Sequence, residues 1–531
     1  MPPIVIVGAG IGGLSTAIAL KRKLGLGAND FTIYEKASDV GGTWRDNIYP
    51  GASSDVAVHF YSLSTDLNPD WPSTHASQPE MLDYLRKLAR KYELYPQIAF
   101  NRLVVSATWS AAEQVYHVVT EDVVSRKRSS TTAKILVSAL GLLETPHTPE
   151  IAGLGSFKGE MFHSARWDTG ADLRGKRVAV IGNGASATQF IPLITQDSTV
   201  HVTQFCRTPN WFLPPIRADY SPLWRWTFRN VPLAMRLYRL YLYLRTESLY
   251  MFVFANKTMR SKFAVLAKDY IVKTAPKADV DRLIPSYSLG CKRIIFDTNF
   301  LEALHRPNLD LNWDGIQHVV KDGIVTKTGE RLPFDAIILA TGFTTDRYPL
   351  TVVGSEGTTV QEYYDTQGGP KAYLGTTVPG FPNFFILGGP NTATGHTSVI
   401  LTEEIQIDYI LALSAPLLSG ALSALSPTPR ATDAYNALLQ SRLAHSVFVG
   451  CTSWYRTGGG AGRVTGIFPG SMMLYRCWLR APRWQDYNVF APPAAAAKWE
   501  KGLRREKWMG WVSPVQWLAR LAEVLVLGMG G

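Results

Sequence analysis

Two stretches of this chain share a pattern: a short apolar run ends in glycine and is followed by a helix with apolar periodicity. The first, residues 3–23, reads PIVIVGAGIGGLSTAIALKRK, and FTIYEK follows at residues 31–36. The second, residues 175–194, reads GKRVAVIGNGASATQFIPLI, and STVHVTQFCRTP follows at residues 198–209. A continuous apolar run bounded by a turn predicts a buried strand, and apolar residues three and four apart predict a helix packed on it. Each stretch therefore predicts a βαβ unit of a parallel sheet.

The glycines of the first stretch stand where a dinucleotide-binding turn needs them. Gly8 allows a tight turn, Gly10 leaves room for a pyrophosphate beside the backbone, and Gly13 lets the helix pack closely on the strand. Glu35 ends the next strand, where its carboxylate can accept a hydrogen bond from a ribose hydroxyl. These features together predict a complete dinucleotide site.

The second stretch repeats the small residues but changes the charge after the next strand. Gly182, Gly184 and Ala187 take the three small positions, and the following strand runs into Arg207 in place of an acid. A guanidinium pairs with a 2′-phosphate that a carboxylate would repel, so this unit is expected to bind NADP in preference to NAD. Further cofactor contacts are expected from the same turn and the first helical turn: Asn183, Ala185, Ser186 and Thr188.

Two such units, the first at the N-terminus, predict an α/β protein with two Rossmann-like domains, one for FAD and one for NADP. PFDAIILATGF, residues 333–343, predicts a strand that leads the chain back to the first domain. An aromatic and basic segment, residues 221–265, predicts a helical insert. A wall over the active-site cleft is favoured for it over a helix on a membrane surface. The expected division is an FAD-binding domain in two parts (1–148, and 346–531 with a C-terminal segment), an NADP-binding domain in two parts (149–215 and 287–345), and a helical insert at 216–286.

Composition and charge narrow the class of protein. Hydrophobic residues make up 46% of the chain, which excludes a disordered protein. The net charge of +11 comes from Lys and Arg spread along the chain, so it indicates anionic cofactors and no nucleic acid. The four cysteines form no CxxC pair and no spacing typical of a disulfide, which predicts a reducing, cytoplasmic location. The apolar end of the chain, residues 512–531, is expected to dock onto the body of the protein, with membrane-surface contact as the alternative.

Several other chemistries lack their motifs in this sequence. Disulfide reduction by a flavoprotein needs a redox-active cysteine pair, which the chain does not contain. It has no HExxH zinc helix and no GxSxG nucleophile turn either, and no metal site is predicted. A flavin and NADPH then leave simple dehydrogenation or reaction of the reduced flavin with oxygen.

Three blocks resemble one family of flavoenzymes. FKGEMFHSARWD (residues 157–168) fits FxGxxxHxxxW[P/D], and GGTWRDNIYPGASSD (residues 41–55) fits [A/G]GxW followed by [F/Y]PG and Asp. PSYSLGCKRIIFDTNFLEAL (residues 285–304) is similar to a block that carries a Lys-Arg pair. The chain thus resembles the type I Baeyer–Villiger monooxygenases, and fungal members most in appearance. The resemblance implies FAD and NADPH as cofactors and O2 and an apolar ketone as reactants. One oxygen atom would be inserted beside the carbonyl through a C4a-peroxyflavin, which gives an ester or a lactone.

The resemblance also implies roles for single residues. Arg293 would stabilise the negative charge on the flavin peroxide and on the oxygens of the attacked ketone, and Asp55 would hold Arg293 in place. Lys292 would grip the NADP 2′-phosphate together with Arg207 and Thr208. The positions that align with flavin contacts are Thr43, Trp44, Asp46 and Tyr61, and Asp55 and Arg293 also align with cofactor contacts.

The fingerprint histidine is interpreted as a mechanical residue. In the resembled family this His and Trp lie on the linker between the two nucleotide domains, so Gly159 is expected to permit a bend while His163 and Trp167 lock the linker. One departure is that Ser288 and Ile294 stand where relatives have proline, which predicts a more mobile loop around Arg293.

Two other functions compete with ketone oxygenation. One is an N- or S-oxygenating flavin monooxygenase, which Trp167, Asp55 and Arg293 argue against. The other, from a different class, is a membrane-surface binding protein that keeps a flavin fold for structure only. A monomer is expected, and membrane contact is not the favoured interpretation.

Overall fold

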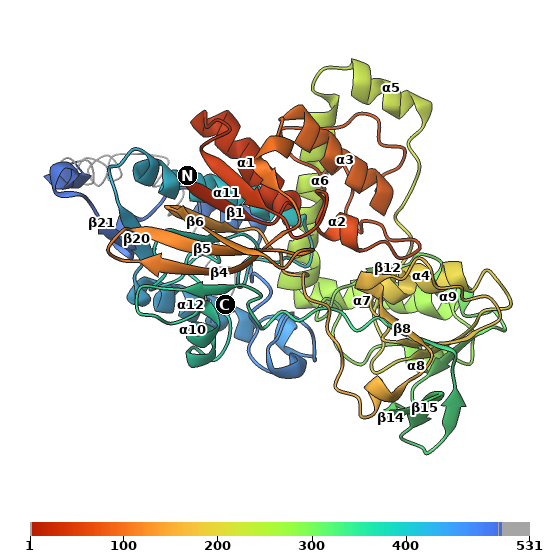
Figure 1. The fold of residues 1–531 in the computed structure, drawn as a ribbon. Helices are drawn as coiled ribbons and strands as arrows, with labels where there is room; N and C mark the ends of the chain where they lie inside the picture. The colour runs from red at the N-terminus through yellow and green to blue at the C-terminus, as the bar shows by residue number, and fades with distance from the viewer. Residues whose placement is uncertain (1–2, 498, 502–531) are drawn as a thin grey trace.

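Two lobes, each with a parallel five-stranded sheet, make up most of the molecule (Figure 1). The computed structural model describes residues 3–497 and 499–501. Residues 512–531, which are expected to dock onto the body of the protein, lie outside the described residues. The α/β class with two dinucleotide-binding folds is confirmed, because both sheets are parallel and each contains a strand followed by a glycine turn and a helix.

The first sheet combines strands that precede the second lobe in the sequence with one strand, β19, that follows it. Its strand order is β19 (Phe384–Ile386), β7 (Ile135–Ser138), β1 (Ile4–Val7), β2 (Phe31–Tyr34), β3 (Ile98–Ala99). Strands β1 and β7 are buried along their whole length, as in a parallel sheet covered on both faces. Helices α1 (Ile11–Leu24), α3 (Gln78–Lys91) and α11 (Val399–Leu418) contribute to the same apolar core.

The other elements of the first lobe surround this sheet. A second sheet has the order β18 (Thr351–Val353), β4 (Arg102–Ser110), β5 (Val115–Asp122), β6 (Arg128–Ala133), and a short one pairs β20 (Ala424–Pro427) with β21 (Tyr487–Phe490). The remaining helices are α2 (Thr43–Asp46), α10 (Val360–Thr366), α12 (Pro429–Ala444) and α13 (Met472–Trp478). Chain segments that precede and follow the second lobe in the sequence thus pack together in the core of the first lobe.

The second lobe carries the repeated nucleotide turn. Its sheet order is β13 (Leu309–Asn312), β10 (His201–Phe205), β9 (Arg177–Ile181), β17 (Ala336–Leu339), β8 (Glu160–His163). Helices α4 (Ala185–Ile194) and α9 (Phe300–Ala303) pack against it. An antiparallel sheet follows: β14 (Ile316–Val320), β15 (Gly323–Thr326) and β16 (Arg331–Pro333). A two-stranded sheet pairs β11 (Phe212–Leu213) with β12 (Ile295–Phe296).

The fingerprint block does not form a free linker, because residues 160–163 are edge strand β8 of the second sheet. The role expected for Gly159 is corrected accordingly. A Cβ on Gly159 would lie 2.4 Å from the Asp335 carbonyl oxygen and 2.7 Å from the Phe157 ring. Glycine is needed there for close approach of two backbones, and the residue has no left-handed φ that would mark a bend.

The helical insert links the lobes. It contains α5 (Pro222–Asn230), α6 (Ala234–Leu249), a π-helical turn (Tyr250–Ala255), α7 (Lys257–Thr274) and α8 (Val280–Leu283). Figure 1 shows α5 projecting beyond the rest of the molecule, with α6 leading back to the lobes. An aromatic cluster of His59, Tyr220, Phe228 and Tyr238 fixes α5 and α6 to the first lobe. In the described part of the chain, the helices are too short or too polar to cross a bilayer.

Candidate active site

The first glycine turn has the geometry of a pyrophosphate site. Gly8 has φ +104°, and a Cβ there would lie 2.8 Å from the Ala139 carbonyl oxygen. A Cβ on Gly13 would lie 1.9 Å from the Gly8 carbonyl oxygen, so only glycine lets α1 start this close to β1. Gly10 precedes α1 without a side-chain cap, which leaves the helix N–H groups free for an anion.

Glu35 lies at the end of β2 beside this turn. Its buried carboxylate accepts hydrogen bonds from the Ala9 N–H at 2.8 Å, the Ala37 N–H at 2.9 Å and Arg45 Nη1 at 3.1 Å. A carboxylate has about four acceptor sites, so one remains for a ribose hydroxyl. The local charges therefore fit the adenosine half of FAD.

The other predicted flavin contacts gather next to the same turn. Thr43, Trp44 and Asp46 form α2, which the Gly41 N–H joins to the Ala9 carbonyl at 3.0 Å. The ring of Tyr61 meets the ring of Trp44 edge-on at 5.7 Å. Burial is the main reason why the pKa of Tyr61 is raised, so its hydroxyl stays a neutral donor.

The second glycine turn repeats the first with fewer side-chain contacts. Gly182 has φ +110°, and a Cβ there would lie 2.4 Å from the Ala340 carbonyl oxygen. Asn183 donates to the Thr208 carbonyl at 2.9 Å, which ties the turn to the end of β10. Gly184, Ala185 and Ser186 are open or half-open to solvent at the start of α4. Ala187 and Thr188, in contrast, have buried side chains, so they pack the helix and do not face a ligand.

Three predicted phosphate-binding residues come together at the end of β10. Lys292 Nζ donates to Thr208 Oγ1, and its ammonium also lies 4.9 Å from the centre of the Tyr287 ring. The pKa of Lys292 is lowered by burial and then by the nearby Arg207 cation. No carboxylate within the described residues pairs with Arg207 or Lys292. Two neighbouring cations without a counter-ion favour a bound phosphate.

Arg293 and Asp55 form an ion pair between segments from the two lobes. Arg293 Nε and Nη2 both donate to Asp55 Oδ2, at 2.9 and 2.6 Å. The Asp55 charge is the main reason why the pKa of Arg293 is raised, so the guanidinium stays charged at every working pH. Nη1 reaches only the Thr394 carbonyl, at 3.5 Å. Two of the five N–H donors therefore have no partner within the described residues, and 31% of the side chain is exposed.

Two buried side chains near Arg293 are not among the site residues that the sequence predicted. Tyr455 lies close enough for the charges of Arg293 and Asp55 to affect it, and burial raises its pKa to about 12. The ring of His396 contacts the rings of Tyr250 and Phe254 of the insert at tilted angles, and burial lowers the pKa of His396. Tyr455 belongs to GCTSWY (residues 450–455), so a weak sequence signal existed for it. For His396 the sequence offered none.

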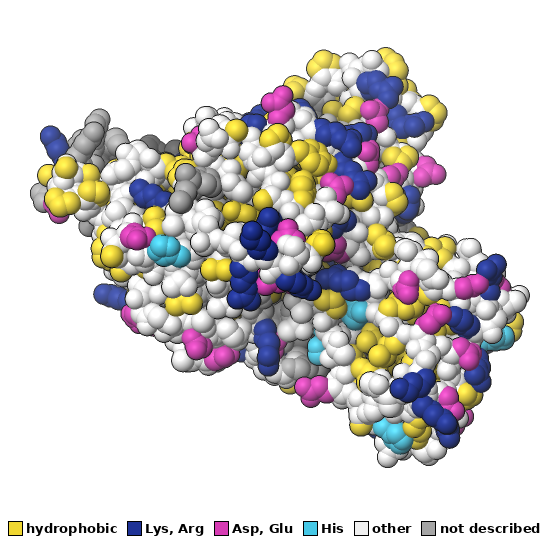
Figure 2. All heavy atoms as spheres, in the orientation of Figure 1, with side chains coloured by type: hydrophobic (Ala, Val, Ile, Leu, Met, Phe, Trp, Pro, Cys, Tyr) yellow, Lys and Arg dark blue, Asp and Glu magenta, His cyan; other side chains and the backbone are white. Residues whose placement is uncertain are grey.

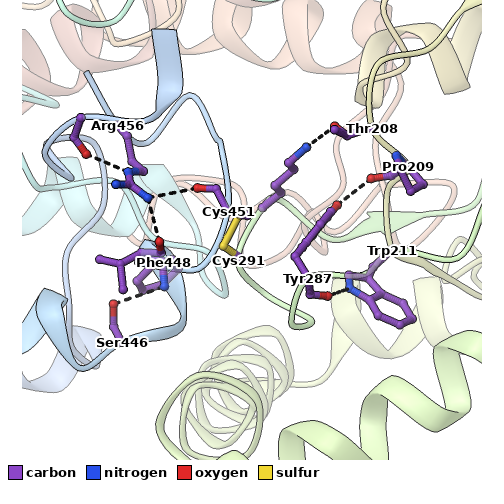
Figure 3. The surroundings of a disulfide bond; sticks show 12 residues. Thr208, Pro209, Trp211, Tyr287, Cys291, Ser446, Phe448, Cys451 and Arg456 are labelled. Atoms are coloured by element: carbon purple, nitrogen blue, oxygen red, sulfur yellow. Dashed lines mark hydrogen bonds between the residues drawn. A yellow bond between two sulfur atoms is a disulfide. The ribbon is translucent and has the colours of Figure 1, made fainter. Parts of the chain in front are cut away.

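A disulfide corrects the expectation drawn from the cysteines. Cys291, directly before Lys292 and Arg293, is bonded to Cys451, 160 residues later (Figure 3). Figure 3 shows Tyr287 and Trp211 on one side of the bond and Phe448 and Arg456 on the other. Spacing along the chain could not reveal this pair because folding brings the two segments together. The bond also anchors the loop whose missing prolines predicted mobility, and it removes the reason given for a reducing location.

Opening this disulfide is expected to destabilise the protein. Cys451→Ser should lower the free energy of unfolding by about 2 to 5 kcal/mol, because the bond closes a long loop in the unfolded chain. Denaturant unfolding of the non-reduced protein measures the effect. Cys477→Ser, at an exposed free cysteine, is the control and should change nothing. Equal stability of the two variants would contradict a structural role for the bond.

The fingerprint side chains hold β8 in the second lobe. His163 Nδ1 accepts from the Ala165 N–H at 3.0 Å, and its ring packs on Phe343. Burial lowers the pKa of His163 to about 4, so the ring is neutral at physiological pH. Trp167 meets Phe162 of β8 and Phe190 of α4. In this structure neither residue contacts Arg293 or Asp55.

His163→Ala is expected to keep FAD and the fold while slowing turnover or increasing hydrogen peroxide release, because the residue positions the second lobe. Since the ring is neutral well above pH 4, the pH profile of turnover should keep its shape between about pH 6 and 9. Steady-state kinetics with peroxide detection measures both. His201→Ala, at an exposed histidine, is the control. Loss of FAD from the His163 variant would assign this residue to the flavin site.

Comparison with known proteins finds flavin-dependent monooxygenases. The family model "Flavin-binding monooxygenase-like" matches residues 2–224. Relatives named Baeyer-Villiger monooxygenase, from Streptomyces coelicolor and Pseudomonas aeruginosa, are 36% and 38% identical, each over 93% of this chain and 93% and 92% of their own. The FAD-binding monooxygenase ktnD of Aspergillus niger is 35% identical over 94% of this chain and 83% of its own. Bacterial relatives thus match as well as this fungal one.

Solved structures agree over nearly the whole chain. A closed form of cyclohexanone monooxygenase matches with a TM-score of 0.81 and 25% identity, over 92% of this chain and 99% of that chain. The OTEMO complex with FAD and NADP gives the same values.

Proposed function

We propose how the site works from the premise that this chain belongs to the Baeyer–Villiger monooxygenases, since relatives of that name are 36% and 38% identical over 93% of it. The protein is an FAD-dependent enzyme that uses NADPH and O2 to insert one oxygen atom next to a ketone carbonyl, which gives an ester or a lactone. The geometry of the site supports a role for single residues in that reaction.

The observation that carries the assignment is the Arg293–Asp55 ion pair. Bound FAD supplies electron transfer and oxygen activation. Asp55 fixes one edge of the Arg293 guanidinium and keeps it charged, while the two free N–H donors can meet negative charge on the oxygen atoms of the reaction. A preorganised cation of this kind favours oxygen transfer to the ketone over release of hydrogen peroxide.

The cofactor cradles fit both nucleotides. The α1 N-terminus, Gly8 and Gly13 would bind the FAD pyrophosphate, and Glu35 its ribose. Arg207, Lys292 and Thr208 would bind the 2′-phosphate of NADP. Cofactor contacts of Trp44, Tyr61, Asn183 and Ser186 are part of the same proposal. Ala187 and Thr188 would act by helix packing.

Loss of Arg207 is expected to weaken NADPH selectively. A charge-assisted bond contributes about 1.5 to 3 kcal/mol, so Arg207→Ala should raise the KM for NADPH about 10-fold or more, with a smaller change for NADH. Steady-state oxidation of both coenzymes measures the ratio, with Arg126→Ala, at an exposed arginine in the first lobe, as the control. Equal use of NADH and NADPH by the unmodified enzyme would contradict the assignment.

A product screen tests the reaction class. The purified enzyme is given NADPH, O2 and linear, cyclic, aryl and steroidal ketones, plus one thioether. Ester or lactone from at least one ketone is the expected result. Sulfoxide alone would favour the N- or S-oxygenating class, and absence of both flavin and NADPH-dependent O2 uptake would favour the binding-only function.

The domain division remains part of this proposal. One five-stranded sheet is built from β1, β2, β3, β7 and β19, and the other from β8, β9, β10, β13 and β17. This grouping supports an FAD domain at 1–148 and 346–531 and an NADP domain at 149–215 and 287–345. The insert at 216–286 contributes Phe254, whose ring packs on Gly290 and Gly395 beside the Arg293 loop. A monomer and a cytoplasmic location remain predictions, and Cys291–Cys451 argues against the reason first given for the location.

A further inference from the structure

Helix α6 of the insert has apolar residues on a side that is left exposed among the described residues. Leu233, just before the helix, and Leu237, Leu240, Tyr241 and Leu244 are each between 51% and 65% exposed. Their spacing of three and four residues places them on one face, which we call the outer stripe. A folded protein gains nothing by leaving such a contiguous stripe in water, so the stripe calls for a partner.

The opposite face of α6 already has its partner within the protein. Leu242 is buried in the core of the first lobe, Tyr238 belongs to the aromatic cluster, and Arg239 donates to the carbonyls of His59 and Ser62. The helix is therefore anchored on one side and apolar on the other. The outer stripe is not needed to attach the insert.

The neighbouring helix α5 extends the same kind of surface. Leu223, Trp224 and Trp226 are 71%, 49% and 58% exposed, while Phe228 anchors the helix to the lobe. Tryptophan is favoured where an apolar body meets a polar rim, as at the boundary of a lipid bilayer. Figure 2 shows hydrophobic and basic side chains side by side on the part of the molecule where Figure 1 shows α5.

The charge around the outer stripe is positive. Helices α5 and α6 contain five arginines and one acid, Glu247, which accepts from backbone N–H groups at the start of α13. Two of these arginines, Arg229 and Arg239, are paired with carboxylates of the first lobe, which leaves three without a carboxylate partner among the described residues. On a helix of 3.6 residues per turn, Arg236 and Arg245 fall on the two sides of the stripe, and both are at least partly exposed. Long basic side chains can lie along an apolar surface and extend their charge to its polar boundary.

A cavity continues this surface into the molecule. Arg236 and Leu240 also line a hollow of about 510 Å³, together with Arg22, Lys23 and Arg476. Its walls are largely apolar, and two carboxylates, Glu404 and Asp408, lie in the lining as well. Glu404 is already hydrogen-bonded to Ser64 and paired with Arg239, and Asp408 is paired with Lys23.

We propose that the outer stripe, α5 and the flanking arginines form a surface that lies on an anionic lipid membrane. Leu, Tyr and Trp side chains would enter the interfacial region while Arg225, Arg236 and Arg245 meet lipid phosphates. A second copy of the chain fits less well, since a two-fold contact would place this surplus of cations against itself. Binding at the membrane would bring the enzyme to the phase in which apolar ketones concentrate.

Vesicle sedimentation with the full-length, FAD-loaded enzyme tests the proposal. Wild-type protein should bind phosphatidylcholine vesicles with about 30% phosphatidylserine at least about tenfold more tightly than pure phosphatidylcholine, and about 0.5 M NaCl should reduce the difference. Two variants, Leu237→Ser with Leu244→Ser and Arg236→Glu with Arg245→Glu, should each weaken binding about tenfold or more. FAD content and ketone turnover in solution should stay at wild-type values.

Matched controls test whether vesicle binding depends on this surface or only on the total exposed apolar area and net charge of the protein. Val124→Ser with Phe490→Ser removes exposed apolar side chains elsewhere, and Lys158→Glu with Lys321→Glu makes the same charge change on the second lobe. Both should bind like wild type. The proposal is overturned if wild-type protein does not bind the anionic vesicles. It is also overturned if the α6 variants bind as well as their controls, which would move the contact elsewhere, or if those variants instead convert a wild-type dimer that ignores vesicles into a monomer.

Discussion

Arg293→Ala is expected to separate flavin reduction from oxygen transfer. Without oxygen, the variant should still be reduced by NADPH, because hydride delivery depends on bound coenzyme and not on a cation beside the oxygen atoms. With oxygen, ester formation should fall by about 10² to 10³ or more, because removal of one preorganised donor group costs about that factor. NADPH consumption should then end mainly in hydrogen peroxide. Stopped-flow reduction and product analysis on one preparation measure both halves.

Two further variants show which property of Arg293 matters. Arg293→Lys keeps the charge but loses the planar fork, so it should recover part of the ester yield. Asp55→Ala leaves the guanidinium charged but no longer held at 2.6 and 2.9 Å by a carboxylate, so a smaller loss is expected than for Arg293→Ala. Ester formation by Arg293→Ala at a near-normal rate would remove the central residue from this mechanism. The N- or S-oxygenating reaction would then become the better hypothesis.

Gly13→Ala is expected to abolish FAD retention. The added Cβ would lie 1.9 Å from the Gly8 carbonyl oxygen, and neither that carbonyl nor the helix can move without changing the turn. Overpacking of this kind costs about 1 to 3 kcal/mol and sometimes more. Because the α1 N–H groups that would face the pyrophosphate move with the helix, FAD affinity should fall by at least about 100-fold. The ratio of flavin to protein absorbance after gel filtration measures the loss.

Gly155→Ala is the matched control for that experiment. It adds the same methyl group at a glycine with no heavy atom within 4 Å of the new Cβ and no left-handed φ. Its FAD content should equal that of wild type. A fully loaded Gly13→Ala enzyme would show that α1 tolerates displacement and that the close approach at Gly13 is not required for FAD binding.

Much of the fold could be predicted from short segments. The glycine turns near Gly8 and Gly182 need positive φ and close backbone approach, and both requirements are met by residue types a few positions apart. The same holds for Glu35, which ends the strand directly after the first βαβ crossover. Local backbone geometry of this kind can be predicted from the residue types in a short segment.

Contacts between segments that are far apart in the sequence could not be predicted from such local patterns. Asp55 and Arg293 are 238 residues apart, and only a family resemblance placed them together before the structure did. The Cys291–Cys451 bond was missed because spacing along a chain says nothing about two loops that packing brings into contact. Buried contributors such as His396 depend in the same way on how the insert folds over the Arg293 loop.

The amino-acid order alone decided that this chain has two nucleotide-binding units, which of them carries a cation at its strand end, and which residues can form helices in the insert. It could not decide which face of α6 is covered, because apolar residues occur on both faces of that helix. Burial is a property of neighbours, and the neighbours of α6 come from the N-terminal and C-terminal parts of the chain. Only the tertiary structure therefore decided that Leu242 is inside and Leu237 outside.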